Sequence, residues 1–520
     1  MTSLLVKKQV LPLPAIKRVL VKSYWLGINE MRLDASFYAE EVTVVERILK
    51  EMGYPLLDLG ELTERIFYTS RSKRYYTNKA EGTPYLTSSE VQWFLPEPKY
   101  VLANELPNKE EWYAKEGWIL LTRSGTVGLV TLVSRDMEKY LLSEHMIRMV
   151  PKPDTLTGYL YAYLSSWFGQ TYITKSIFGG VVEEIEPHHV QSIPVPRLPK
   201  EVQKAIHNNM LKVSNMREKA RQLMNSAERL LYKEIGLTEL ELKVNRRSFT
   251  VNSYRLKLRF DASYHDPVLR IINNKLCNAR WPLKRLDDKE VSRKIFIPNR
   301  FKRIYVQKEF GVPFLSGTNI LQTKPHSLKY LSKRTHNLEN YILKEGMILV
   351  AARGTIGRIM PITKSIDGWA ASDNIARIVP NEVNSGFLAC FLNTMYGQAQ
   401  LIGQTAGSIV NLIEPQHIAE VQIPIPPKDV QKAIGNLIVE AYELKELSNK
   451  TEDETVKTLE TMFEEHRMTE VNEEYLKEIN AYVDSFELIG NEQFRKSREE
   501  LESGRTISFD EFKKEHGFNV

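Results

Sequence analysis

The chain has 520 residues, of which 42% are hydrophobic and 26% are charged, so it has the composition of a folded protein with more than one domain. No run of about 18 apolar residues is present, and we therefore predict no transmembrane helix. The apolar pieces at the N-terminus are interrupted by basic residues and make a poor signal peptide. Two cysteines cannot build a disulfide framework or a zinc site, so we expect a cytoplasmic protein.

The net charge of +6 is unevenly distributed along the chain. Residues 470–520 carry 13 acidic and 7 basic side chains, which leaves the rest of the chain with a net charge of +12. A basic body favours a polyanionic partner such as nucleic acid, although many other proteins are as basic.

The first half of the chain predicts one helix, a series of short strands and then further helices. Apolar spacing indicates a helix over residues 31–50, and Leu56-Leu-Asp-Leu is typical of a strand. Short apolar runs bounded by Gly, Pro and Ser predict the next strands, which begin at Pro84, Trp118, Leu129 and Met146. A single helix is predicted over residues 157–176, although Phe168-Gly-Gln within it has the composition of a turn.

Most of this pattern occurs twice. The segment Gly117-Trp-Ile-Leu-Leu-Thr-Arg-Ser-Gly-Thr-Val-Gly matches Gly346-Met-Ile-Leu-Val-Ala-Ala-Arg-Gly-Thr-Ile-Gly, and Arg32-Leu-Asp-Ala-Ser matches Arg259-Phe-Asp-Ala-Ser. The offset of 227–229 residues is far longer than the roughly 20–50 residues of solenoid repeats, so a whole domain is duplicated. The second copy repeats the strands and predicts one helix over residues 385–402. We therefore expect an α+β fold with two duplicated domains.

A long helix is predicted after each copy. Val202-Gln-Lys-Ala-Ile and Val430-Gln-Lys-Ala-Ile open two segments whose apolar residues recur with the 4,3 spacing of coiled coils. We predict that the two helices pair, with Asn209 as a register lock; the alternative is that each helix packs on its own domain. The predicted pairing residues are Val202, Ile206, Asn209, Val213, Met216, Leu223, Val430, Ile434, Leu437 and Leu444.

These elements predict five parts of the chain. They are a lead-in with the first domain (1–198), the first long helix (199–240), the second domain (241–427), the second long helix (428–468) and an acidic tail (469–520).

Two loops at equivalent places concentrate basic and aromatic residues. Residues 64–79 have a net charge of +4, and residues 293–308 contain six basic residues and no acidic one. Lys and Arg attract phosphates, whereas aromatic rings and Arg forks contact bases. One such loop fits a solvated surface equally well, but two at matching places favour nucleic acid. The candidate DNA-binding residues here are Arg65, Arg71, Lys73, Arg74, Tyr75, Tyr76, Arg293, Lys294, Arg300, Lys302 and Arg303.

No motif predicts catalysis. Ser124-Gly-Thr-Val-Gly and Arg353-Gly-Thr-Ile-Gly lack the Lys of a phosphate-binding loop. We predict tight turns between strands, with further DNA-binding candidates at their tips: Arg123, Ser124, Thr126, Arg353 and Thr355. His189 and His417 have too few neighbouring ligands for a metal site, and Glu186 and Glu414 are expected to cap the next helix. Methyltransferase and helicase signatures are absent, and no convincing nuclease motif occurs.

The duplicated glycine turns and the Ile193-Pro-Val-Pro and Ile423-Pro-Ile-Pro exits resemble the specificity subunit of type I restriction–modification systems, over roughly residues 25–465. The resemblance implies two target recognition domains, each recognising half of a split double-stranded DNA site. It implies an antiparallel helix pair that holds two methyltransferase subunits, with restriction subunits outside them. S-adenosylmethionine, ATP and Mg²⁺ are then expected on the partner subunits and no cofactor on this chain. The acidic tail and the N-terminal lead-in depart from the family pattern.

Two other functions stay open on the sequence alone. The chain could be a stand-alone nuclease or DNA-modifying enzyme with duplicated recognition domains, which the absent catalytic motifs disfavour. It could also be an anti-restriction decoy or a protein-binding scaffold, in which the acidic tail would be the active part.

Overall fold

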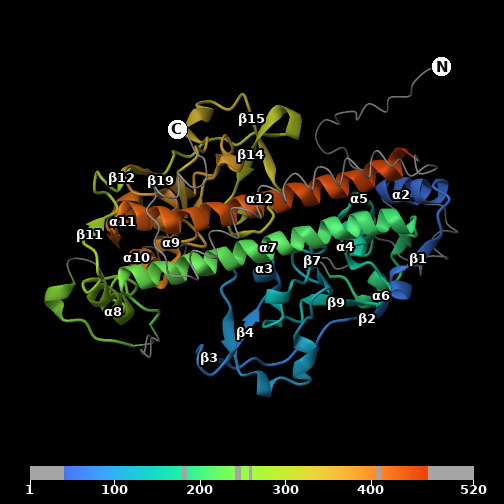
Figure 1. The fold of residues 1–520 in the computed structure, drawn as a ribbon, viewed down its shortest axis with the longest axis horizontal. Helices are drawn as coiled ribbons and strands as arrows, with labels where there is room; N and C mark the ends of the chain where they lie inside the picture. Colours follow the sequence, from blue (N-terminus) through green and yellow to red (C-terminus); the bar gives the residue numbers. More distant parts are fainter. Residues whose placement is uncertain (1–39, 178–183, 241–247, 257–259, 406–411, 466–520) are drawn as a thin grey trace, which may run out of the picture. The chain divides into compact units, whose positions relative to one another are not determined.

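The computed structural model describes residues 40–177, 184–240, 248–256, 260–405 and 412–465 (Figure 1). The lead-in and the acidic tail predicted from the sequence lie outside these residues. Contacts divide the described chain into two units. The first unit contains residues 40–88, 99–210 and 453–465, and the second contains residues 89–98 and 211–452. Each unit therefore includes one duplicated domain and a piece of chain from the other half of the sequence.

The first copy consists of three small sheets with helices packed around them, which confirms an α+β domain. One four-stranded sheet has the order β2-β9-β6-β7, and a second has the order β3-β5-β4-β8. The strands are β1 (Leu56–Asp58), β2 (Thr63–Phe67), β3 (Tyr76–Thr77), β4 (Thr83–Leu86), β5 (Lys99–Val101), β6 (Ile119–Thr122), β7 (Val130–Leu132), β8 (Leu141–Leu142), β9 (Met146–Pro151) and β10 (Pro194–Pro196), of which β1 pairs with β10. The helices are α2 (Glu40–Glu51), α3 (Ser88–Val91), α4 (Thr157–Ser165), α5 (Trp167–Lys175) and α6 (Pro187–Gln191).

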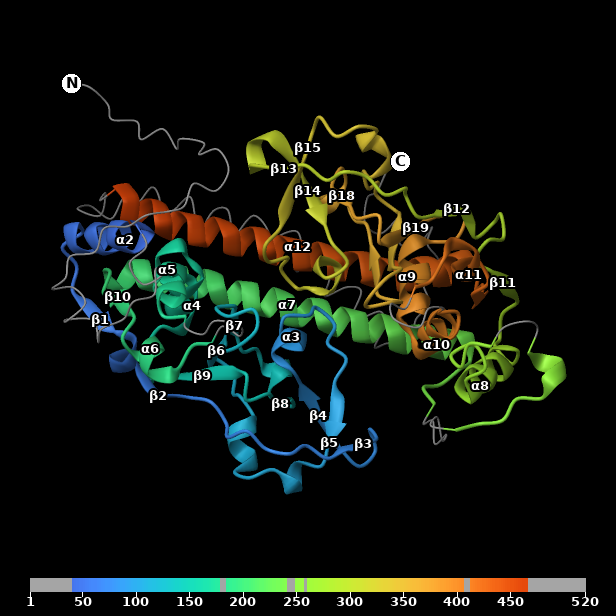
Figure 2. The ribbon, with the colours of Figure 1, turned by 180° about the vertical axis from the view of Figure 1, so that it is seen from behind.

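The second copy repeats this topology strand by strand. Its sheets have the orders β12-β19-β16-β17 and β13-β15-β14-β18, and β11 pairs with β20. The strands β13, β14, β15 and β18 of the second sheet lie close together in Figure 2. The strands are β11 (Leu283–Arg285), β12 (Ser292–Phe296), β13 (Tyr305–Val306), β14 (Gly311–Leu315), β15 (Lys329–Ser332), β16 (Ile348–Ala351), β17 (Ile359–Pro361), β18 (Ala370–Ala371), β19 (Ile375–Pro380) and β20 (Gln422–Pro424). The helices are α8 (Pro267–Leu276), α9 (Ser385–Asn393), α10 (Met395–Gly403) and α11 (Pro415–Ala419). The duplication inferred from the sequence is thus present in the fold.

The single helix predicted over residues 157–176 is wrong, because two helices lie there. Ser166 has extended backbone angles, ends α4 and accepts a hydrogen bond from the Gly169 N–H as the N-cap of α5. A Cβ at Gly169 would clash with the carbonyl oxygen of Tyr163, so the close approach of the two helices requires glycine. Phe168-Gly-Gln is therefore the first turn of α5 and not a turn between elements. The prediction over residues 385–402 fails for the same reason, since Thr394 caps α10.

One glutamine in this motif joins the helices to the glycine turn. The Gln170 side-chain amide donates to the carbonyl oxygens of Gly128 (3.0 Å) and Leu164 (2.8 Å). Gln398 makes the equivalent bonds to Gly357 and Leu392, both at 2.7 Å. The recurrence of Gly-Gln in both copies thus has a structural cause.

The long helices α7 (Lys200–Ile235) and α12 (Lys428–Glu465) pack together in opposite directions (Figure 1). The start of α7 shares the first unit with the end of α12, and the end of α7 shares the second unit with the start of α12. The end of each helix packs on the domain of the other copy. Phe463 of α12 lies edge-on to Phe168 at 4.8 Å between ring centroids, and Tyr232 of α7 lies 6.0 Å from Tyr396.

A buried polar cluster joins the helices within the second unit. Arg217 of α7 pairs with Glu452 of α12 at 2.6 Å, and Lys324 pairs with the other oxygen of Glu452 at 2.7 Å. Arg217 also donates to Ser448 and Asn449. The polar stretch of the second helix, which interrupts the apolar spacing in the sequence, is therefore buried and bonded.

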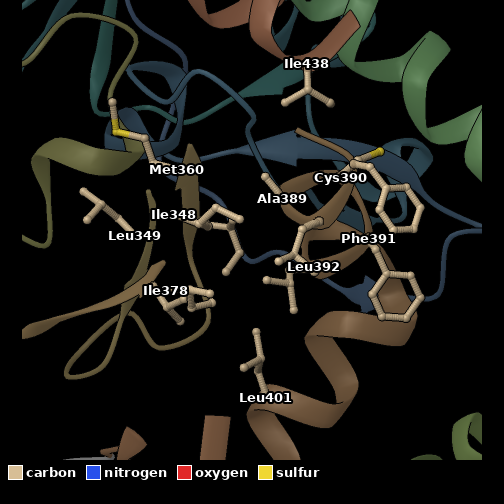
Figure 3. Packing of buried hydrophobic residues seen from close by; sticks show 14 of the residues in the cluster. Ile348, Leu349, Met360, Ile378, Ala389, Cys390, Phe391, Leu392, Leu401 and Ile438 are labelled. Carbon is tan, nitrogen blue, oxygen red and sulfur yellow. The ribbon is translucent and has the colours of Figure 1, made fainter. Parts of the chain in front are cut away.

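The core of the second unit is continuous from its sheet to the long helices. Ile348 and Ile378 of the sheet point toward Leu392 of α9, whereas Leu349 points to the opposite face of the sheet, and Ile438 of α12 lies at the α9 side of the cluster (Figure 3). All five side chains are at most 1% exposed. Burial of this kind contributes about 25 cal/mol per Å² of apolar surface, so α12 is part of the domain core and not a detachable spacer.

Candidate nucleic-acid interface

The smaller sheet of the first copy carries an exposed group of aromatic and basic side chains. Tyr75 and Tyr76 are 44% and 57% exposed at the edge strand β3. The Lys73 Nζ lies 4.8 Å from the ring centroid of Tyr75, and the Lys99 Nζ lies 5.9 Å from that of Tyr76. A flat ring beside an ammonium group can stack on a base while the charge meets a phosphate.

The second copy presents the same arrangement on its equivalent sheet. Tyr305, the counterpart of Tyr76, is 41% exposed, and the Lys329 Nζ lies 4.8 Å from its ring centroid. Ile304 and Phe310 beside it are 50% and 64% exposed. Large exposed apolar side chains next to lysines are typical of a contact surface and not of an inert loop. We call the exposed residues of these two sheets the tip surfaces; they are Lys73, Tyr75, Tyr76 and Lys99 in the first copy and Lys302, Ile304, Tyr305, Phe310 and Lys329 in the second.

Other predicted residues lie in the loops before the tip sheets or on strands of the larger sheets. Arg71 and Arg300 are exposed in the loops that lead to β3 and β13. Arg65 on β2 pairs with Glu111 at 2.6 Å and stacks on Phe67 at 3.8 Å, and Lys294 on β12 lies 4.5 Å from the Phe296 ring. Arg293 is exposed, and its Nε donates to the Asn381 side chain at 2.7 Å.

Two predicted arginines form ion pairs with buried carboxylates. Arg74 pairs with the buried Glu144 at 2.6 Å and donates to the Tyr85 hydroxyl at 2.9 Å. Arg303 pairs with the buried Asp373 at the equivalent place. Each pair ties the base of a basic loop to the segment that precedes β9 or β19. We assign these two guanidinium groups a positioning role beneath the tip surfaces.

The glycine turns occur as predicted, but their arginines differ in placement. Gly125 and Gly128 have φ values of 82° and 97°, and Gly354 and Gly357 have 77° and 83°, a region that favours glycine. Thr126 and Thr355 are exposed at the tips. Ser124 is half-buried, with its Oγ 2.5 Å from His145 Nδ1, and Arg353 is half-buried beside Leu412.

Arg123 is not presented at the tip of its turn. Its side chain is 13% exposed, pairs with Glu186 and with Glu184 at 3.3 Å, and stacks on Tyr68 at 4.3 Å. Glu186 is also the N-cap of α6, as predicted, and its backbone N–H donates to His189 Nδ1 at 3.3 Å. Among the described residues, no group of three or more His, Cys, Asp and Glu side chains is arranged to hold a metal ion.

The predicted pairing residues are buried or half-buried on α7 and α12. The buried ones are Val202, Ile206, Asn209, Val213, Leu223 and Ile434, and the half-buried ones are Met216, Val430, Leu437 and Leu444. Asn209 is 7% exposed. Across the described chain, no helix has the length and hydrophobicity that crossing a bilayer requires.

Sequence reasoning missed Lys99 and Lys329, which face the exposed tyrosines from a neighbouring strand. Strand pairing brings them there, since β5 pairs with β3 and β15 pairs with β13. The available signal was the dipeptide Lys-Tyr, which recurs at Lys99-Tyr100 and Lys329-Tyr330 with an offset of 230 residues. The role of Arg148 and Arg377 was missed as well: both are at most 1% exposed, and their guanidinium groups donate to backbone carbonyls of the described residues.

A sequence model of the type I restriction modification DNA specificity domain matches residues 54–228 and again residues 295–458. The two matches fall on the two copies and together span more than half of the chain. Among solved structures, the chain is similar to the type I restriction–modification S subunit from M. genitalium, with 13% identity and a TM-score of 0.33 over 79% of this chain and 96% of that one. It is also similar to the HsdS subunit from Thermoanaerobacter tengcongensis, with 16% identity and a TM-score of 0.26 over 80% and 96%. No curated protein matches the sequence.

Proposed function

Because the chain belongs to the family of type I restriction–modification DNA specificity domains, we propose that it recognises a split DNA site, one half with each copy. The observation that carries this proposal is the recurrence of the tip surface. Tyr76 with Lys99 and Tyr305 with Lys329 stand at matching places on matching sheets. Two equivalent surfaces on one chain suit a DNA site with two half-sequences around an unrecognised spacer.

Different side chains of the tip surfaces contact the phosphates and the bases. Lysine ammonium groups neutralise phosphates and supply affinity that depends on salt, and this contribution carries no sequence information. Side chains that differ between the copies supply different base contacts. The first copy offers two tyrosines, whereas the second offers Ile304, Tyr305 and Phe310. The two half-sites are therefore expected to differ in sequence.

The helix pair supplies separation and a surface for partners. A helix of 36 residues, the length of α7, spans about 54 Å at about 1.5 Å per residue. Leu211 of α7 and Val439 of α12 are each 37% exposed, so apolar surface remains uncovered on both helices. We propose that two methyltransferase subunits bind this surface and that restriction subunits join the complex through them.

The chain has no catalytic role of its own in this proposal. Methyl transfer with S-adenosylmethionine, and cleavage that uses ATP and Mg²⁺, belong to the partner subunits. The placement of the charged groups supports a non-catalytic role. The lysines of the tip surfaces are placed for binding, and the charged groups of the buried ion pairs are used in packing.

A reconstitution experiment tests whether this chain binds DNA while the methyltransferase subunit performs methyl transfer. Purified chain is incubated with DNA, S-adenosylmethionine, ATP and Mg²⁺, with and without a cognate methyltransferase subunit. We expect DNA binding by the chain and methylation only after the methyltransferase is added. Methyl transfer or cleavage by the chain alone would overturn the proposal and favour a stand-alone enzyme.

A further inference from the structure

Residues 89–98 come from the first copy, where they connect β4 to β5, but their contacts belong to the second unit. Phe94 is 3% exposed in the core of the second unit, and its ring lies 5.3 Å from that of Tyr442 on α12. Trp93 lies under the Arg358 guanidinium at 5.2 Å, and Glu97 forms an ion pair with the same arginine. This connecting loop is therefore anchored, because its aromatic side chains pack in the core of the second unit.

This segment pairs with its own counterpart from the second copy. The Phe94 N–H donates to the Leu321 carbonyl oxygen at 2.8 Å, and the Thr323 N–H donates to the Gln92 carbonyl oxygen at 2.9 Å. Trp93 and Gln322 therefore lie opposite each other in an antiparallel bridge. The offset of 229 residues converts each position of one strand into a position of the other.

This offset also relates the two hydrogen bonds to each other, because the donor Phe94 corresponds to the donor Thr323 and the acceptor Gln92 corresponds to the acceptor Leu321. The contact is thus isologous, as at a twofold axis between identical subunits, although both strands belong to one chain. A local pseudo-twofold axis therefore relates the two paired segments at Trp93 and Gln322. We call residues Gln92–Phe94 and Leu321–Thr323 together the clasp.

The clasp is anchored on the long helices. The Asn449 side-chain amide of α12 donates to the Thr323 carbonyl oxygen at 2.8 Å. Lys324, the next residue, pairs with Glu452, which pairs with Arg217 of α7. The Lys445 Nζ lies 5.8 Å from the Phe94 ring. The Asn449 side chain and the packing of Phe94 therefore hold the clasp to α12, and the ion pairs of Glu452 connect it to α7 as well.

Short connections join the clasp to both tip surfaces. In the first copy, β4 ends at Leu86 and β5 begins at Lys99, so the clasp strand lies within the link between two strands of the tip sheet. In the second copy, β14 ends at Leu315 and β15 begins at Lys329, with the 3₁₀ helix Asn319–Leu321 between them. The clasp strand is again the link within the tip sheet.

We propose that the clasp determines spacer specificity: by pairing the links of the two tip sheets with each other, it fixes the separation at which the two half-sites are accepted. This rests on the proposed function, since it adds the residues that position the two recognition surfaces. Gln92–Phe94 and Leu321–Thr323 are positioning residues, with no DNA contact of their own. Loosening them widens the range of spacer lengths and leaves the bases of each half-site unchanged.

A disulfide tests the clasp itself. Trp93 and Gln322 form the non-hydrogen-bonded type of antiparallel pair, with Cα atoms about 4.5 Å apart, which lies within the range of disulfides. In a Cys277→Ser background, Trp93→Cys with Gln322→Cys should form a crosslink on mild oxidation, visible as altered mobility on a non-reducing gel. Each single variant and the pair Ser89→Cys with Gln322→Cys serve as controls. No crosslink in the Trp93–Gln322 pair would overturn the clasp.

Spacer mapping tests its role in specificity. The complex with the methyltransferase carries wild-type chain, Phe94→Ala, or Phe387→Ala, which removes an equally buried ring of the same core outside the clasp. Sequencing of methylated genomic DNA then gives half-sites and spacer lengths. We expect additional spacer lengths for Phe94→Ala alone, with the same half-site bases, and wild-type spacing for the oxidised disulfide variant.

The outcomes separate the two proposals. A wild-type spacer in Phe94→Ala, or an equal broadening in Phe387→Ala, would overturn the role of the clasp while leaving two half-sites in place. A wild-type complex that methylates one contiguous site would contradict the proposed function, whatever the crosslink shows.

Discussion

Arg148 on β9 donates a hydrogen bond to the carbonyl oxygen of Leu142 on β8 at 2.7 Å and so joins the two four-stranded sheets of the first copy. Its guanidinium group also donates to the carbonyl oxygens of Met146 and Trp112. Burial lowers the pKa of Arg148 to about 10, which leaves the group charged at neutral pH. Arg377 repeats the bond in the second copy, to Ala371 at 2.6 Å. The tip surface of each copy is therefore attached to the larger sheet through one buried arginine.

Replacing Arg148 by Met should destabilise the protein by about 3 kcal/mol or more, because a hydrogen bond from a charged group contributes about 1.5–3 kcal/mol and three carbonyls lose their donor. Urea unfolding followed by circular dichroism measures the change. Arg71→Met, at an exposed arginine, is the control and should leave the free energy of unfolding within about 0.5 kcal/mol of wild type. Equal effects of the two substitutions would show that the buried bonds do not hold the sheets together.

Lys99→Ala combined with Lys329→Ala should weaken DNA binding and flatten its salt dependence. Each phosphate contact contributes about 0.9 to the slope of log K against log salt concentration, so loss of two contacts reduces the slope by about 1.8. Fluorescence anisotropy with a DNA duplex at several salt concentrations gives the slope. Lys115→Ala with Lys344→Ala, two exposed lysines at equivalent places outside the tip surfaces, is the matched control. A slope that stays at the wild-type value in the Lys99/Lys329 variant places DNA elsewhere.

His207 makes stability depend on pH in a defined direction. Its Nδ1 accepts the Gly158 N–H at 2.9 Å, and burial lowers the pKa of the imidazole below 6.5. Between the lowered pKa and 6.5 the unfolded chain binds more protons, so stability is complete above about pH 6.5 and falls as the pH decreases. His207→Asn keeps an acceptor but does not titrate.

The free energy of unfolding of His207→Asn should therefore decline less between pH 7.5 and pH 5.5 than that of the wild type. His336→Asn, at an exposed histidine, should follow the wild-type decline. If all three proteins show the same decline, the Gly158–His207 bond does not control it.

Arg217 and Glu452 should be strongly coupled, because their side chains are 15% and 5% exposed at 2.6 Å. Removing one partner leaves a buried charge, which costs about 3–5 kcal/mol, whereas replacing both by Met is expected to cost much less than the sum of the single changes. A double-mutant cycle of Arg217→Met and Glu452→Met in urea unfolding measures the coupling. The exposed Glu454→Met variant is the control. If the changes in the free energy of unfolding from the two single substitutions simply add, the Arg217–Glu452 pair does not couple the two helices.

The duplicated fold could be predicted from the sequence because its signals are local and occur twice. Glycine turns, four-residue apolar runs and the 4,3 spacing of the helices each depend on a few consecutive residues. The break at Ser166 was a local signal too, since a Ser or Thr three residues before Gly occurs in both copies. The continuous apolar composition of residues 157–176 outweighed it.

The sequence did not allow us to predict which basic residues form ion pairs and which lie free for DNA at the surface. Arg74 meets Glu144 across 70 positions of sequence and Arg123 meets Glu186 across 63, so composition of the loop alone cannot separate a paired arginine from a surface one. The clasp is still less visible, since Phe94 bonds to Leu321 and Thr323 bonds to Gln92 through main-chain atoms alone. The buried cluster around Glu452 appears in the sequence only as a polar interruption of the helix.

Exchange of one tip surface tests the central claim most directly. Residues 71–79 of the first copy are replaced by residues 300–308 of the second, and the complex with the methyltransferase is used to map methylated sites by sequencing. The wild-type chain should give two different half-sequences around a constant spacer. The exchanged chain should keep one half-sequence and the spacer and change the other half alone. A single contiguous site, or simultaneous change of both halves, would contradict recognition of one half-site by each copy.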